Sequence, residues 1–90
     1  MGTLRYGVDS YDVPDEDLTT LQFAIWDATR LDTGFMLELV YASRYVYLPI
    51  SRGVPIALII DTPEPLHRGD KVVEEWSNWA RIGGSITIHI

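Results

Sequence analysis

The chain contains no cysteine, which excludes disulfide bonds, a thiol nucleophile and thiolate metal ligands. It also lacks any apolar run near the ~18–20 residues that a membrane-spanning helix needs. The residues around Arg5, near the amino terminus, include no apolar signal-peptide core. We therefore expect a cytoplasmic protein that does not cross or enter a membrane.

Familiar catalytic motifs are missing as well. The sequence has no P-loop, no G-x-G-x-x-G, no H-E-x-x-H and no G-x-S-x-G pattern. Its histidines are His67, in a predicted loop, and His89, at the end of the chain. Catalysis needs a nucleophile, a base and a group that orients them. The sequence therefore predicts a protein that is not an enzyme and that holds no cofactor.

Basic residues are scarce: seven Lys and Arg stand against 13 Asp and Glu, for a formal net charge of −6. Such a surface repels phosphate, which proteins bind by releasing counterions with Lys and Arg. Direct binding to nucleic acid or to an anionic membrane is therefore disfavoured. The same charge favours a protein partner with a basic surface, including the nucleic-acid groove of another protein. The alternative is that the charge only keeps the protein soluble.

The sequence has the composition of an ordinary globular domain, with 47% hydrophobic and 22% charged residues in 90 positions. We expect one domain over residues 1–90. Hydrophobic periodicity predicts helices at 14–31 and 71–82. Alternation and one continuous apolar run predict strands at 3–8, 35–41, 44–50, 54–60 and 85–90. The run at 54–60 predicts a central strand that is buried on both faces.

These elements give the order β-α-β-β-β-α-β and an α+β fold class. We expect a single-domain two-layer sandwich, with a mostly antiparallel sheet and both helices packed on one face. Residues 42–43 are either a hairpin turn or a bend in one long strand, and a merged strand gives a ferredoxin-like order. The α-β-β-β-α middle is similar in order to double-stranded-RNA-binding folds. Glu74 and Glu75 stand where such a domain places basic residues, so RNA binding is not expected.

The densest negative charge lies in residues 9–17, Asp-Ser-Tyr-Asp-Val-Pro-Asp-Glu-Asp, where we predict a loop followed by a helix start. Asp15, Glu16 and Asp17 fit the first turn of that helix, where the positive end of the dipole favours anions. Asp12 is a candidate N-cap. Asp9, Tyr11 and Asp12 lie before the helix and lack a sufficient local explanation, so the first half of the run is the better candidate for binding a partner.

Aromatic side chains mark two more candidate surfaces. Phe23 and Trp26 lie opposite the apolar stripe of the first helix, either under another layer or facing a partner. Tyr45 and Tyr47 share one face of their strand, where they form either an exposed binding surface or cross-strand pairs. By contrast, the spacing of Trp76 and Trp79 predicts that both belong to the core.

The metal candidate with the best spacing is Asp61-x-x-Glu64-x-x-His67, which offers two carboxylates and an imidazole just after a predicted strand. The alternative is that Asp61 caps the strand end while Glu64 and His67 are solvated. A small metal-dependent enzyme that uses this loop is therefore one alternative function.

The leading hypothesis is a non-enzymatic protein-interaction domain, as in a phage-type inhibitor or a nucleic-acid-mimicking decoy that binds a basic surface of a larger protein. The predicted contact residues are Asp9, Tyr11, Asp12, Asp15, Glu16, Asp17, Phe23, Trp26, Tyr45 and Tyr47. The other alternative is a self-associating structural or assembly subunit, a homo-oligomer held by the aromatic surfaces and by edge-to-edge pairing of the last strand.

Overall fold

The computed structural model describes residues 1–63 and 66–90. In chain order its elements are β1 (Gly2–Tyr6), β2 (Asp9–Val13), α1 (Asp15–Leu31), β3 (Phe35–Val40), β4 (Tyr45–Ile50), β5 (Ile56–Ile59), α2 (Asp70–Arg81) and β6 (Ser85–His89). The α+β class and the order of the predicted elements are confirmed, with β2 as an additional strand, and residues 42–43 belong to the connection of a hairpin between β3 and β4. No helix within the described ranges is long and apolar enough to span a bilayer.

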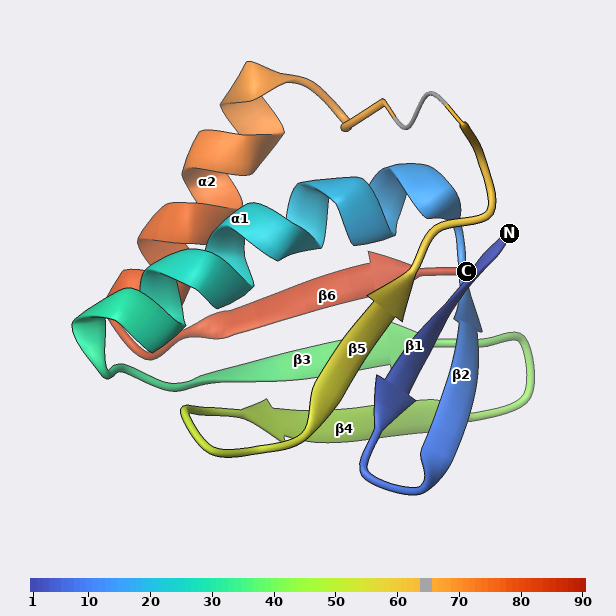
Figure 1. The fold of residues 1–90 in the computed structure, drawn as a ribbon, viewed down its shortest axis with the longest axis horizontal. Coiled ribbons are helices and arrows are strands. Elements are labelled where there is room, and N and C mark those ends of the chain that lie inside the picture. Colours follow the sequence, from blue (N-terminus) through green and yellow to red (C-terminus); the bar gives the residue numbers. More distant parts are fainter. Residues whose placement is uncertain (64–65) are drawn as a thin grey trace.

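The strands form two three-stranded sheets where one sheet was predicted, and we call them sheet A (β2-β1-β5) and sheet B (β4-β3-β6). Neighbouring strands are antiparallel, apart from β3 and β6, which are parallel. In Figure 1 the strands of sheet A run steeply across those of sheet B, and α1 and α2 lie together beside β6. Each sheet therefore combines strands from both halves of the chain.

The predicted loop at residues 9–13 is wrong, because this segment is strand β2. A two-residue turn of Gly7 and Val8 joins it to β1, and Gly7 has φ +62°. Glycine at the first position of such a turn suits the right-handed twist of a hairpin. Asp12, the candidate N-cap, lies within β2, and α1 instead follows Pro14. The feature of the sequence that indicates strand β2 is the alternation of Tyr11 and Val13 with polar neighbours.

A single core lies between the sheets and the helices. Its buried side chains come from the inner faces of both sheets and from both helices: Leu4, Val13, Leu18, Leu21, Ala24, Ala28, Phe35, Leu37, Leu39, Leu48, Ile50, Ala80, Ile86 and Ile88. The alternation along β3 puts Leu37 and Leu39 at the centre of this cluster, and both are fully buried. Consequently the core covers one face of sheet B. The opposite face carries the residues that alternate with the buried ones along each strand.

The two sheets are also joined by tyrosine hydroxyls at their edges. Tyr6, in sheet A, donates a hydrogen bond to the carbonyl of Pro49 in β4, at 2.6 Å. Tyr41, just after β3, donates to the carbonyl of Asp12 in β2, at 3.0 Å. Each bond satisfies a carbonyl of an edge strand, so the sheets hold one another at two separate points.

Three details of the prediction are wrong. β5 is an edge strand, because only its β1 side is paired, and it is not buried on both faces, since Ile59 on its outward face is 42% exposed. The sequence suggests Gly34 as the left-handed residue that ends the first helix, but α1 ends at Leu31 and its C-cap is Asp32, whose φ of +53° is left-handed; an aspartate tolerates it. Trp79 is 45% exposed rather than in the core, whereas the polar Ser77 is buried.

Trp79 instead packs against the chain that leads into β6. The backbone N–H of Gly84 donates to the Trp79 carbonyl at 2.8 Å, and a Cβ at Gly84 would lie 2.6 Å from Cε3 of the Trp79 ring. We predict that Gly84→Ala lowers the free energy of unfolding by about 1–3 kcal/mol through this overlap, as measured by urea denaturation.

A Trp79→Ala background is the control for that substitution, because it removes the ring. There, Gly84→Ala is expected to cost clearly less, so the double-mutant cycle gives a favourable coupling. An equal cost in both backgrounds would contradict the assignment of the effect to Trp79.

Candidate interaction surface

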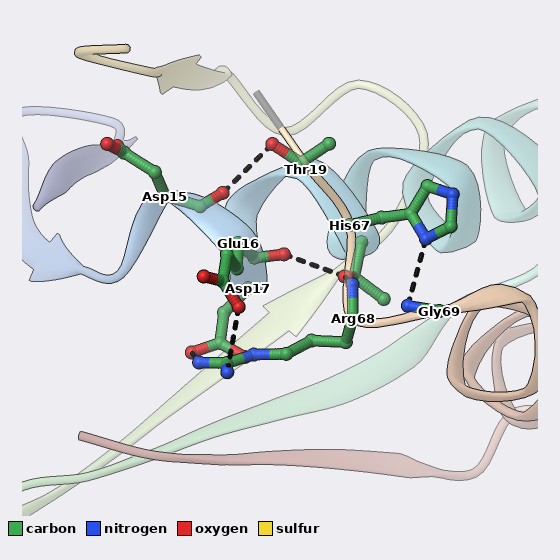
Figure 2. Close-up of polar contacts among 8 residues, drawn as sticks. Asp15, Glu16, Asp17, Thr19, His67, Arg68 and Gly69 are labelled. Atoms are coloured by element: carbon green, nitrogen blue, oxygen red, sulfur yellow. Dashed lines mark hydrogen bonds and ion pairs between the residues drawn. The ribbon is translucent and has the colours of Figure 1, made fainter. Parts of the chain in front are cut away.

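The second half of the acidic run is used inside the fold. The guanidinium of Arg68 donates to Asp17 through Nε to Oδ1 (3.0 Å) and through Nη2 to Oδ2 (3.2 Å), and its Nη1 lies 3.0 Å from Oε2 of Glu16. The Asp17 side chain is only 8% exposed. Figure 2 shows Arg68 reaching from the loop before α2 to these carboxylates at the start of α1.

Thr20 completes this contact, which we call the Arg68 clamp (Glu16, Asp17, Thr20 and Arg68). Its hydroxyl accepts the backbone N–H of Arg68 at 2.8 Å and donates to the carbonyl of Glu16 at 2.7 Å. The hydrogen bond to Asp17 raises the pKa of Arg68 above its ordinary value. The clamp therefore fastens the chain before α2 onto α1, and the charge of Asp17 is neutralised within the fold.

Asp15 is also engaged by the protein itself. Its Oδ1 accepts the backbone N–H of Asp61 at 3.2 Å, and its Oδ2 lies 3.6 Å from the amino group of Met1. Of the predicted contact residues, Asp15, Glu16 and Asp17 thus have structural partners. They position the segment after β5 and are poor candidates for a surface that binds another protein.

Asp9 and Asp12 are both exposed, but they lie on opposite faces of strand β2. Asp9 pairs with Tyr6 and shares the inward side of sheet A with Tyr11, which is half-buried against the core. Asp12 pairs with Thr3 on the outward side. Side chains of opposite parity point to opposite faces of a sheet. The five carboxylates of the run therefore do not form one continuous acidic site.

The aromatic pair on α1 faces outward. Trp26 is 66% exposed and Phe23 is 40% exposed. The ring of Phe23 meets the ring of His67 edge to face, with centroids 6.1 Å apart. Phe23 thus has a partner in the loop before α2, and Trp26 is a largely exposed apolar side chain of a kind that is common on protein surfaces.

The outer face of sheet B brings together residues from three strands. Cross-strand register sets three rows across it: Tyr45–Val40–His89, Tyr47–Glu38–Thr87 and Pro49–Met36–Ser85. We call these nine residues the outer face. Tyr45 is 64% and Tyr47 is 59% exposed, because the core and both helices lie on the opposite side of the sheet.

Glu38 lies at the centre of the outer face, between Tyr47 and Thr87. Among the residues that the structure describes, no Lys or Arg forms an ion pair with it. None of the nine outer-face residues is a Lys or Arg. A half-exposed carboxylate between aromatic and polar neighbours is suited to a cationic group from outside the chain. The sequence alone does not single out Glu38 as a candidate, because a single acid carries no motif.

The proposed metal ligands are not brought together in the described parts of the chain. Glu64 lies outside the described residues. Nδ1 of His67 accepts the backbone N–H of Gly69 at 2.9 Å, and its Nε2 is 3.6 Å from Oδ1 of Asp70. Within residues 1–63 and 66–90 no group of three His, Asp or Glu side chains has a metal-binding arrangement. The contacts described for these residues are within the protein: the backbone N–H of Asp61 bonds to Asp15, and the His67 ring contacts Gly69 and Asp70.

The Arg68 clamp makes a direct prediction about stability. Arg68→Met leaves the carboxylate of Asp17 buried without its cation, so we expect the free energy of unfolding to fall by about 2 kcal/mol. Arg30→Met is the matched control, since Arg30 pairs with Asp27 at the surface (3.2 Å), and it should cost about 0.5 kcal/mol or less. Urea denaturation of both variants checks this, and equal costs would refute a special role for the clamp.

Tyr41 predicts a dependence of stability on alkaline pH. Burial raises its pKa above the ordinary value of 10.0, Arg44 lowers it, and Asp12 and Tyr11 raise it. A group whose pKa is raised by folding contributes its stability in full below pH 10 and loses it as pH rises through the folded pKa. Above pH 10, the free energy of unfolding should therefore fall less steeply in Tyr41→Phe than in the wild type.

The matched control is Tyr45→Phe, because the Tyr45 ring is largely exposed. Denaturation curves at several alkaline pH values should give this variant the wild-type slope. A wild-type slope in Tyr41→Phe as well would contradict the prediction.

Comparison of the chain with protein-family models, with curated proteins and with solved structures finds no match.

Proposed function

We propose that this protein is a non-enzymatic interaction domain that binds a basic surface of a larger protein through the outer face of sheet B. The observation that supports this most directly is the row Tyr47–Glu38–Thr87, in which a carboxylate without a described ion-pair partner lies beside an exposed aromatic ring. The proposal assigns the contact to Glu38, Tyr45 and Tyr47.

The chemistry of this row suits an arginine or lysine side chain of the partner. Its cationic head can bind the carboxylate of Glu38 while its aliphatic stem or guanidinium plane lies over the ring of Tyr47. Tyrosine provides a large contact area at a low entropic cost, which is why it is frequent at interface hot spots. Val40 and Met36 supply apolar surface on either side of Glu38 along β3.

The remaining carboxylates act at longer range in this proposal. Asp9 and Asp12 lie on opposite faces of β2, so they cannot both touch one partner surface. Together with the net charge of −6 they still attract a basic protein and speed its association. Binding should therefore weaken as salt rises, because exposed charges are screened over about 8 Å at physiological ionic strength.

The narrower form of the proposal is an inhibitor that occupies a nucleic-acid groove of its partner, as a phage-type decoy does. An inhibitor of this kind competes with DNA or RNA for the partner. An ordinary docking domain binds a basic surface without that competition. Adding duplex DNA to the purified complex separates the two forms.

The test uses matched variants of the protein as bait in affinity capture from lysate of the source cells, read by quantitative mass spectrometry at low and high salt. The partner is then purified and titrated. We predict that Tyr47→Ala weakens binding by roughly thirtyfold, as expected for a hot-spot aromatic residue. We also predict that Glu38→Gln weakens binding and reduces its salt dependence.

Two substitutions serve as controls. Trp26→Ala removes an exposed aromatic ring from α1, and Glu74→Gln makes the same change of charge as Glu38→Gln at an exposed position on α2. Both should bind within about twofold of the wild type, since rim and remote residues contribute little. If the controls lose as much affinity as the outer-face variants, or if salt has no effect, the proposal is wrong.

A further inference from the structure

Strand β6 uses only half of its backbone groups to pair with β3. The N–H of Met36 donates to the carbonyl of Gly84 (3.0 Å), and the N–H of Ile90 donates to the carbonyl of Val40 (2.9 Å). In a parallel ladder the residues that bond to the neighbour alternate along the strand. The N–H and C=O groups of Ile86 and Ile88 therefore also face β3.

The other half of the backbone faces away from β3. By the same alternation, the N–H and C=O groups of Ser85, Thr87 and His89 point to the free edge of sheet B, where β6 is the last strand. All three residues are exposed. Among the described residues no side chain bonds to these groups. This edge is thus a row of unpaired donors and acceptors.

Each of the other three edge strands is protected against pairing. β2 carries the charges of Asp9 and Asp12, and the Asp12 carbonyl is bonded to Tyr41. β4 contains Pro49, which lacks an N–H and whose carbonyl accepts from Tyr6. β5 is only 4 residues long. Charge, proline and short length are the usual protections of an edge strand.

β6 has none of these protections, since its sequence Ser-Ile-Thr-Ile-His holds no proline, Lys, Arg, Asp or Glu and has three β-branched residues in succession. We propose that the β6 edge pairs with the β6 edge of a second copy of this chain, in an antiparallel two-fold arrangement centred on Thr87. In this register the backbone of Thr87 hydrogen-bonds to Thr87 of the partner subunit, and the backbone of Ser85 hydrogen-bonds to His89 of the partner subunit. Every outward N–H and C=O of the three residues then has a partner.

The register also fits the side chains and charges. Thr87 meets Thr87 of the partner subunit, a favourable cross-strand pair, and Ser85 meets a histidine, so no like carboxylates are opposed. Three interstrand spacings of ~4.8 Å, about 14 Å in all, separate the two Glu38 side chains. This distance exceeds the Debye length of about 8 Å, so their repulsion is largely screened. The pairing joins two outer faces into one continuous six-stranded surface. It does not depend on the proposed function.

The test is sedimentation equilibrium of the purified protein over a micromolar-to-millimolar series, with amide hydrogen exchange at both ends of the series. We expect a reversible dimer in which the amides of Ser85, Thr87 and His89 gain protection with concentration. Because each copy carries a charge of −6, salt should strengthen the dimer. Salt has the opposite effect on the proposed basic partner, so the two proposals fail or succeed separately.

The matched variants are Thr87→Pro and Thr87→Val. Thr87→Pro removes an N–H that β3 does not use, which a free edge tolerates, and should raise the dissociation constant roughly thirtyfold through the loss of two hydrogen bonds. Thr87→Val keeps the backbone donor and the branched shape, and should dimerise like the wild type.

If circular dichroism shows that Thr87→Pro is unfolded, Thr87→Glu replaces it, because it sets two carboxylates directly opposite one another and leaves the backbone intact. A wild-type protein that is monomeric at every concentration and salt overturns the proposal. A dimer in which the three amides exchange at the monomer rate overturns it equally, as does a Thr87→Glu variant that dimerises normally.

Discussion

The alternation of side chains along β3 is the constraint on which the core and both proposed surfaces depend. Leu37 and Leu39 are fully buried on one side of the strand, and Glu38 lies between them on the other. Because β3 pairs with β4 and β6 at once, its register also selects which tyrosines and threonines flank Glu38. A shift of one residue would exchange the buried and exposed sets, so the core enforces the composition of the outer face.

The parts of the fold that sequence could predict are those decided by local periodicity. Both helices, the β3–β4 hairpin strands and β6 follow from spacings of 3.6 and 2 residues. The division into two sheets could not be predicted, because it depends on pairings between segments far apart in the sequence, such as Thr3 with Ile59 and Met36 with Ser85. β5 was misjudged for a related reason: an apolar composition does not distinguish an edge strand from a central one until its neighbours are known.

The acidic run illustrates why closeness in sequence is a weak guide to a binding site. Its carboxylates occupy a strand and a helix start, and the structure gives them separate surroundings. Arg68, which neutralises Asp17, lies 51 positions away and carried no signal of that role. Glu38 is an isolated acid in the sequence, and only the register of three strands shows its aromatic and polar neighbours.

The interleaving of the two sheets determines the order in which this chain can fold during synthesis. In sheet A, β1 gains its second neighbouring strand only when β5 has been made. In sheet B, β3 gains its second neighbour only when β6 has been made. Closing such long loops costs entropy before any contact offsets it, which makes the transition slow and cooperative. Neither half of the chain holds a complete sheet, so β1 and β2 leave the ribosome as a lone hairpin, which is marginal in water by itself. Sheet B closes only when its last strand emerges, and that strand is the one with the unprotected edge.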